Sequence, residues 1–196
     1  MSNPLTRAKK FSQKNAEAKI FCVFSGFCEN QKQKAMEQQQ QWRKLNGTSI
    51  KRSIEDEVRD VLMQEKAAGS NISVCIGTDS QVKGGITEFA TVIVFIRKGK
   101  GGFMYISNEV CKRRMPVKQR MLEEVQRSID VAFNLCEIFI AFNVEMEVHA
   151  DINTSLNFKS NEAFKDAMGY ITGMGFAFKA KPYAFASSSC ANKVVQ

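Results

Sequence analysis

The sequence has little of what several enzyme classes require. It contains one histidine, His149, so a Ser-His-Asp or Cys-His hydrolase would have to use that residue, and no nucleophile-elbow motif accompanies it. The six cysteines are scattered with no CxxC pair, a pattern that favours a reduced, cytoplasmic chain. No apolar run approaches the roughly 20 residues that a membrane span needs. We therefore expect a soluble, cytoplasmic protein with no membrane partner.

Positive charge is in excess but unevenly distributed. The net charge is +8, and clustered Lys and Arg are what a phosphate backbone attracts. Residues 1–45 hold nine Lys or Arg against three Asp or Glu, whereas residues 46–196 hold nineteen against seventeen. The region with regular hydrophobic patterning is almost neutral, so overall basicity does not establish a nucleic-acid partner.

Residues 1–41 differ in character from the rest of the chain. They are polar and basic, with a short apolar stretch at 20–27 and a glutamine-rich stretch at 31–41. This composition is typical of a poorly ordered extension. We expect such an extension over 1–41 and one folded domain over 42–196. A second interpretation is that translation begins at Met36, which would leave residues 1–35 outside the natural protein.

Hydrophobic periodicity predicts alternating helices and strands after residue 45. Glycines and prolines mark the boundaries, and two strand-like runs flank a glycine-rich turn as in a hairpin. The expected elements are a helix from 50 to the stop at 69, strands at 72–77, 89–96 and 103–107, a helix at 116–135, a strand at 145–150, a helix at 160–172, a strand at 176–180 and a short helix after 182.

Acidic residues follow two of these strands. Asp79 comes after the first strand and Asp151 after the fourth, and ligand sites of mixed α/β sheets lie at strand ends. On the helix between them, Glu123 falls opposite the apolar stripe and Glu124 at its border, so Glu124 is the better candidate to face a site. Acidic groups on three elements can converge on a divalent metal. The alternatives are an aspartate that opens a turn and two solvated glutamates.

Five short motifs stand in order along the patterned region. They are IGTDSQV at Ile76–Val82, EFATVIVFIR at Glu88–Arg97, RMLEEV at Arg120–Val125, VHADIN at Val148–Asn153 and GMGFAFKAKP at Gly173–Pro182. As a set, from about Trp42 onwards, they resemble the YkuK family of ribonuclease H-like proteins. The resemblance implies an α/β ribonuclease H-like fold, a mixed five-stranded sheet with an antiparallel hairpin and flanking helices.

The same resemblance implies a function and a site. Active members of this fold hold two Mg²⁺ or Mn²⁺ ions with carboxylates and hydrolyse phosphodiesters. Carried over by position, Asp79, Glu124 and Asp151 are the expected catalytic and metal-binding residues. The prediction is a metal-dependent nuclease that acts on RNA, DNA or a hybrid. The alternatives are a catalytically weakened module that binds nucleic acid or protein, and a small-molecule hydrolase with the same metal pocket.

Basic and polar residues near these acids are candidates for binding the substrate. We expect that role for Ser80, Gln81, Lys112, Arg113 and Arg114. The three cations belong to the densest basic cluster of the patterned region, beside the helix that carries the glutamates, where they can receive phosphates. A solvated surface without a ligand is the alternative for such a charge run.

The end of the chain departs from the family pattern. Nucleases of this fold complete the site with a fourth acidic residue or a histidine near the last helix, and YkuK-type sequences have an aspartate after a Lys-Pro pair. Here Lys181-Pro182 is followed by Tyr183. Tyrosine, with an ordinary pKa near 10, is a poor Mg²⁺ ligand. One metal position is therefore expected to be weak, absent, or completed by water or Asn192.

Overall fold

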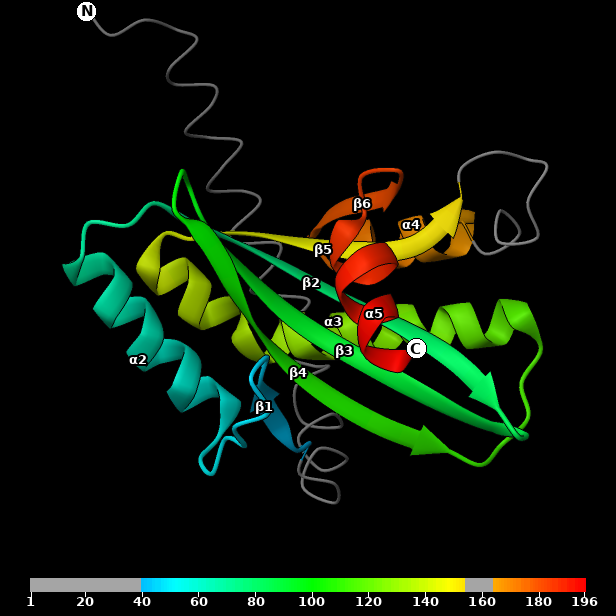
Figure 1. The fold of residues 1–196 in the computed structure, drawn as a ribbon. Coiled ribbons are helices and arrows are strands. Elements are labelled where there is room, and N and C mark those ends of the chain that lie inside the picture. Colours follow the sequence, from blue (N-terminus) through cyan, green and yellow to red (C-terminus); the bar gives the residue numbers. More distant parts are fainter. Residues whose placement is uncertain (1–39, 154–163) are drawn as a thin grey trace, which may run out of the picture. The chain divides into compact units, whose positions relative to one another are not determined.

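The structure, a computed structural model, describes residues 40–153 and 164–196. All of them belong to one unit, Gln40–Gln196, built as a mixed sheet with helices on both faces (Figure 1). The extension expected over residues 1–41 lies almost wholly outside the described residues, so its boundary and its lack of order stay predictions. None of the helices in the two described ranges is long and apolar enough to cross a membrane.

The sheet has six strands in the order β1-β4-β3-β2-β5-β6. β2, β3 and β4 form an antiparallel meander, whereas β5 and β6 run parallel to β2. The five predicted strands are present, and β1 adds a sixth beside β4. In chain order the elements are β1 (Trp42–Lys44), α2 (Ile54–Ala67), β2 (Ile72–Lys83), β3 (Ile86–Arg97), β4 (Gly101–Cys111), α3 (Val117–Phe142), β5 (Glu145–Asn153), α4 (Phe164–Gly173), β6 (Ala177–Lys181), the π-helix η2 (Ala186–Ala191) and α5 (Asn192–Val195).

Strands β2, β3, β4 and β5 all run further than the sequence pattern predicts, and the extensions of β2 and β5 bear on the acidic residues. β2 pairs with β3 as far as Lys83, next to a turn of two glycines with positive φ. β5 continues to Asn153, which pairs with the end of β6. Asp79 and Asp151 therefore lie inside their strands, and the prediction that each follows a strand end is wrong. Hydrogen bonding to a neighbouring strand carries both strands through polar residues, and an apolar pattern does not report that pairing.

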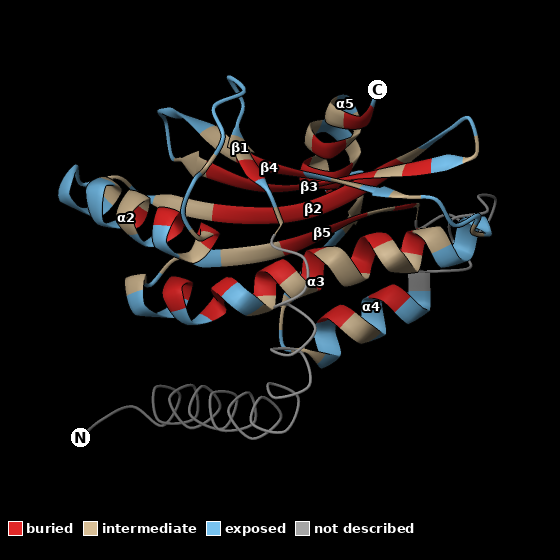
Figure 2. Ribbon diagram, turned by 90° about the horizontal axis from the view of Figure 1, so that it is seen from below, coloured by how far each residue is buried: buried red, intermediate tan, exposed pale blue. Residues whose placement is uncertain are grey.

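Helices α2, α3 and α4 cover one face of the sheet, where Figure 2 shows their buried sides turned towards the strands. The apolar positions of α3 continue past the predicted end at Leu135 to Ile138 and Phe139, both buried, and the helix ends at the left-handed cap Asn143. Each such buried side chain stabilises the fold by about 1.5–3 kcal/mol. For α4, the predicted residues 160–163 lie outside the described part of the chain.

The C-terminal segment covers the opposite face of the sheet. η2 and α5 pack on β2 and β3, as Figure 1 shows for α5. Between them lies a small core of Cys75, Val92, Val94, Ile106, Ala186 and Ala191. The backbones approach so closely at Gly77 that a Cβ there would lie 2.6 Å from the backbone nitrogen of Ser187. A glycine at this position is what allows η2 to reach the sheet.

Gly77→Ala should therefore destabilise the domain by about 1–3 kcal/mol, the usual cost of forcing a methyl group into packed atoms. The free energy of unfolding, measured by urea denaturation, checks this. Gly169→Ala is the matched control, because a Cβ at that α4 position meets nothing within 4 Å. The control should be neutral or gain up to about 1 kcal/mol. Equal stability of Gly77→Ala and the parent would mean that η2 does not pack as described.

Candidate active site

Asp79 and Asp151 lie on neighbouring strands and face the same side of the sheet. In the parallel pair of β2 and β5, Thr78 stands opposite Ala150, and each aspartate is the next residue of its strand. Side chains alternate along a strand. Ala150 belongs to the core under α3, so both aspartates project towards the face that η2 covers. The structure thus brings these two predicted site residues together.

Burial changes the titration of Asp79, whose side chain is largely enclosed. It raises the pKa of this carboxyl from 3.8 to about 6, and the negative charge of Asp151 adds to the rise. The Ser80 backbone N–H donates to Asp79 Oδ1 at 2.9 Å and opposes it. Arg120 and Lys181 oppose it more weakly through their charge. A pKa perturbed by burial and by a second carboxylate is typical of functional sites.

Glu124 approaches from α3, on the other side of β2. Its side chain is only 5% exposed, and its Oε1 accepts a hydrogen bond of 2.5 Å from the Ser80 hydroxyl. Arg120 lies one turn earlier; its guanidinium donates to the carbonyl and hydroxyl oxygens of Ser80 and stands 3.8 Å from Glu124 Oε1. The pKa of Glu124 is raised to about 8, mainly by burial; the Ser80 hydrogen bond lowers it, the charges of Asp79 and Asp151 raise it, and that of Arg120 lowers it.

The three carboxyl groups share one region without forming a closed ligand set. Both aspartates raise the pKa of Glu124, and Asp151 raises that of Asp79. Their oxygen atoms do not all come within 4.8 Å of one another. Within the described ranges, the one group of three His, Cys, Asp or Glu side chains that meets this spacing is Cys75, Glu147 and His149. The aspartates share one face, and Glu124 reaches the region from the other.

The donors at this site fit a hard divalent cation. Carboxylate oxygens are the ligands that Mg²⁺ and Mn²⁺ prefer. Asp151 Oδ1 is buried and accepts no hydrogen bond of good geometry, although Lys181 Nζ lies 2.7 Å away. A bound cation would satisfy this oxygen. It would also offset the burial and the like charge that raise the pKa values of Asp79 and Glu124.

The second cluster, Cys75, Glu147 and His149, is one that sequence reasoning missed. His149 is buried, and its Nδ1 accepts the backbone N–H of Ala186 at 3.1 Å. The neutral ring therefore carries its proton on Nε2, which faces Glu147 Oε2 at 3.3 Å. Burial lowers the pKa of His149 and raises that of Cys75 to about 12. Before any metal binds, the Cys75 thiol and His149 Nε2 each carry a proton, which either group would have to release to act as a ligand.

The expected substrate-binding residues differ in their surroundings. Ser80 is buried; its hydroxyl donates to Glu124 and accepts from Arg120. The Oε1 atom of Gln81 is buried and has no hydrogen-bond partner among residues 40–153 and 164–196. Arg113 pairs with Glu123 at 2.8 Å. Across the described residues, Lys112 and Arg114 form no ion pair. Arg114 lines a hollow of about 380 Å³ at the tip of the β2–β3 hairpin, with Val82, Gly85, Thr87 and Met115.

Tyr183 and Asn192, the residues considered for the last ligand position, make no hydrogen bond or ion pair with Asp79, Glu124 or Asp151 among the described residues. Tyr183 is 74% exposed. The side-chain oxygen of Asn192 accepts a hydrogen bond from Gln196. No acidic residue follows Asp166 in the sequence. Lys181 is instead the residue of this segment that contacts the site.

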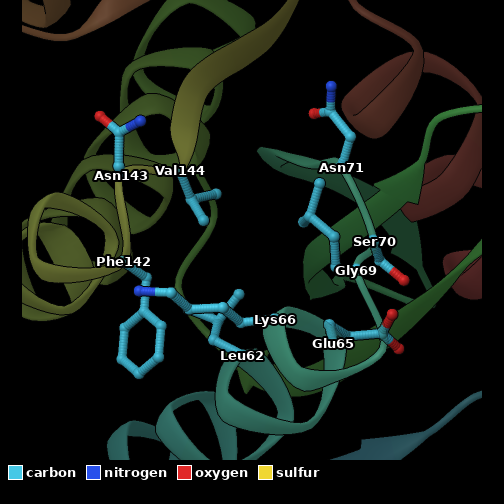
Figure 3. A pocket seen from close by; sticks show the side chains of 10 residues that line it. Leu62, Glu65, Lys66, Gly69, Ser70, Asn71, Phe142, Asn143 and Val144 are labelled. Carbon is cyan, nitrogen blue, oxygen red and sulfur yellow. The ribbon is translucent and has the colours of Figure 1, made fainter.

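A second hollow, also of about 380 Å³, lies between the ends of α2 and α3 (Figure 3). Lys66 and Phe142 line it, with the ammonium group 5.7 Å from the ring centroid. β2 begins there at Ile72, seven residues before Asp79. At about 3.3 Å per residue, this hollow is about 23 Å from the carboxylates. It is therefore not part of the candidate active site.

Comparison with known proteins agrees with this architecture. A family model described as ribonuclease H-like matches residues 54–196, and the chain therefore belongs to the ribonuclease H-like family. Its sequence is similar to the uncharacterized protein YkuK of Bacillus subtilis (strain 168), with 28% identity over 143 residues, 66% of this chain and 82% of that protein. No solved structure matches significantly. The predicted fold and the resemblance to YkuK are confirmed.

Without metal, Asp79 and Glu124 should lower the free energy of unfolding as pH rises from about 4.5 to 8, while His149, whose pKa is lowered, contributes in the opposite direction below about 6.5. A carboxyl group whose pKa is raised in the folded state, as for Asp79 and Glu124, binds more protons folded than unfolded. The contribution of such a group to the free energy of unfolding is fully present below its pKa in the unfolded state. It is lost as pH rises through its pKa in the folded state. Urea denaturation in EDTA measures this slope. Glu124→Gln should flatten it, Glu123→Gln on the same helix should not, and an unaltered slope in Glu124→Gln would contradict the assignment.

Proposed function

We propose that this domain is a divalent-metal-dependent phosphodiester hydrolase, a nuclease, in which Asp79, Asp151 and Glu124 hold the metal. The observation that carries the proposal is the electrostatic coupling of three carboxyl groups from β2, β5 and α3 in a chain of the ribonuclease H-like family. Burying three acidic groups near one another lowers stability unless a ligand compensates. A structural role alone does not account for such an arrangement.

The chain's own residues supply most of what the reaction needs. A bound Mg²⁺ or Mn²⁺ supplies positive charge for the phosphate oxygens and for the attacking water. Asp79 and Asp151 would hold the ion from the η2 side and Glu124 from the α3 side. Ser80 orients the Glu124 carboxyl through a hydrogen bond, and Arg120 donates to the Ser80 hydroxyl and stands 3.8 Å from Glu124 as an ion pair. With a pKa of about 8 before metal binds, Glu124 must release its proton when it becomes a ligand.

Nucleic acid is the substrate class that the neighbouring charges support. In the described ranges Lys112 and Arg114 have no acidic partner, and both precede α3, the helix that carries Glu124. Cations without an intramolecular partner are available to phosphates at little cost. Arg113 is paired with Glu123 and would have to exchange that carboxylate for a phosphate.

One observation favours the alternative, a module that binds nucleic acid without cleaving it. Residues 167–196 contain no Asp or Glu, and Lys181 stands beside Asp151. Such a site still attracts phosphate but holds metal less completely. The two functions predict different results with the same substrates.

Metal binding tests the site directly. Millimolar Mn²⁺ should raise the melting temperature by several degrees, because a ligand at 100 times its Kd adds about 2.7 kcal/mol and each kcal/mol is worth about 2–4 °C at this size. Asp79→Asn should abolish most of that shift. Asp166→Asn, an exposed aspartate on α4, is the control and should keep it. An unchanged melting temperature, with no binding heat by calorimetry, would count against the site.

Cleavage separates enzyme from binding module. Single strands, duplexes and RNA–DNA hybrids should be incubated with the full chain and Mn²⁺, and products resolved on denaturing gels. We expect cleavage that EDTA abolishes and that Asp79→Asn and Asp151→Asn each reduce by more than about 100-fold, since ligand loss weakens both metal affinity and activity. Asp166→Asn should cleave like the parent. Cleavage that survives both changes belongs to another site, and binding without cleavage favours the module.

A further inference from the structure

Lys181 is the last residue of β6 and reaches the carboxylates from the sheet edge. Its Cα partner is Asn153, two residues after Asp151 on the same strand face, and the β5–β6 register shifts between His149 and Asn153. Such an irregularity re-aims a side chain. The Lys181 ammonium lies 2.7 Å from Asp151 Oδ1, and its charge also lowers the pKa of Asp79. Lys181 therefore acts on both aspartates.

The side-chain charge of residues 167–196 is positive only. They contain no Asp or Glu, so no side-chain carboxylate of the segment that follows β6 is available to a second divalent ion. The exposed Tyr183 does not offer one either. In the place where a second cation would need another carboxylate, the chain provides an ammonium group.

We propose that the Lys181 ammonium takes one of the two cation positions, so that the site holds a single divalent ion. The inference rests on the proposed metal-dependent function and states its metal count. An ammonium group is a compact positive charge that also binds phosphate. It occupies Asp151 Oδ1 and repels a second divalent ion there, whereas the single ion held by Asp79, Glu124 and the other oxygen of Asp151 keeps its ligands. Lys181 thereby becomes a positioning residue that supplies fixed charge beside the one metal.

The neighbouring Lys179 shows that this placement is particular to Lys181. Lys179 lies two residues earlier on β6 and is similarly exposed, but it faces Glu147 at 3.7 Å. Glu147 is the acid that also contacts His149, outside the set of three carboxylates. The two lysines therefore differ mainly in which carboxylate they meet, which makes Lys179 a matched control.

The test is the number of Mn²⁺ ions that the full chain binds, measured by isothermal titration calorimetry, with electron paramagnetic resonance to detect coupling between paired ions. Wild type should bind one ion per chain. Lys181→Met, which keeps most of the length of the side chain and removes its charge, should bind two, about 3.5–4 Å apart as in two-metal sites. Lys181→Arg and Lys179→Met should each bind one. Adding Asp151→Asn to Lys181→Met should return the count to one.

Other outcomes overturn the proposal in distinguishable ways. Two ions in wild type, or one ion in a folded Lys181→Met, would show that Lys181 excludes nothing while the metal site itself stands. No ion in any protein would remove the metal-dependent function together with this inference. Should Lys181→Met fail to fold in a thermal melt, Lys181→Gln replaces it, and the wild-type count still decides whether a second ion is excluded.

Discussion

β2 is hydrogen-bonded on both sides, antiparallel to β3 and parallel to β5, and this double pairing determines where every group of the site points. Thr78 and Ser80 face α3, where they meet Ser128 and Glu124. Asp79 faces the other way. A slip of one residue would exchange the two sides, turning the aspartate into the helix interface and the serine away from its glutamate. The pairing along the whole length of β2 prevents that slip.

The same pairing places three acidic groups where water is scarce. Burial raises the pKa values of Asp79 and Glu124; the charge of Asp151 adds to both rises, and that of Asp79 adds to the rise for Glu124. Only Arg120, Lys181 and the Ser80 hydrogen bonds act in the opposite direction. A domain selected for stability alone would not keep this cluster, because replacing such residues by apolar ones commonly stabilises a fold. The cation binding that we propose would offset this cost.

Sequence patterns predict much of this architecture for a definite reason. Apolar periodicity reports which face of an element is buried, and that is sufficient for the element order and for choosing Glu124 over Glu123. It carries no information on pairing between distant segments. The nearness of Cys75 to Glu147 depends on the β2–β5 register, and that of Lys181 to Asp151 on β6 and its irregular pairing. An apolar pattern does not predict these contacts, nor does it predict that β2 and β5 extend beyond their aspartates.

The covering of Cys75 by η2 has a practical meaning. Its thiol lies under the π-helix, and its raised pKa keeps it protonated and unreactive. His149 holds that helix to β5 through the backbone of Ala186. A thiol reagent reaches this sulfur only after the C-terminal segment has lifted from the sheet. The rate at which Cys75 becomes labelled therefore measures the rate of that opening. Cys75 lies on the same face of the sheet as the two aspartates, so the measurement also reports when that face is uncovered.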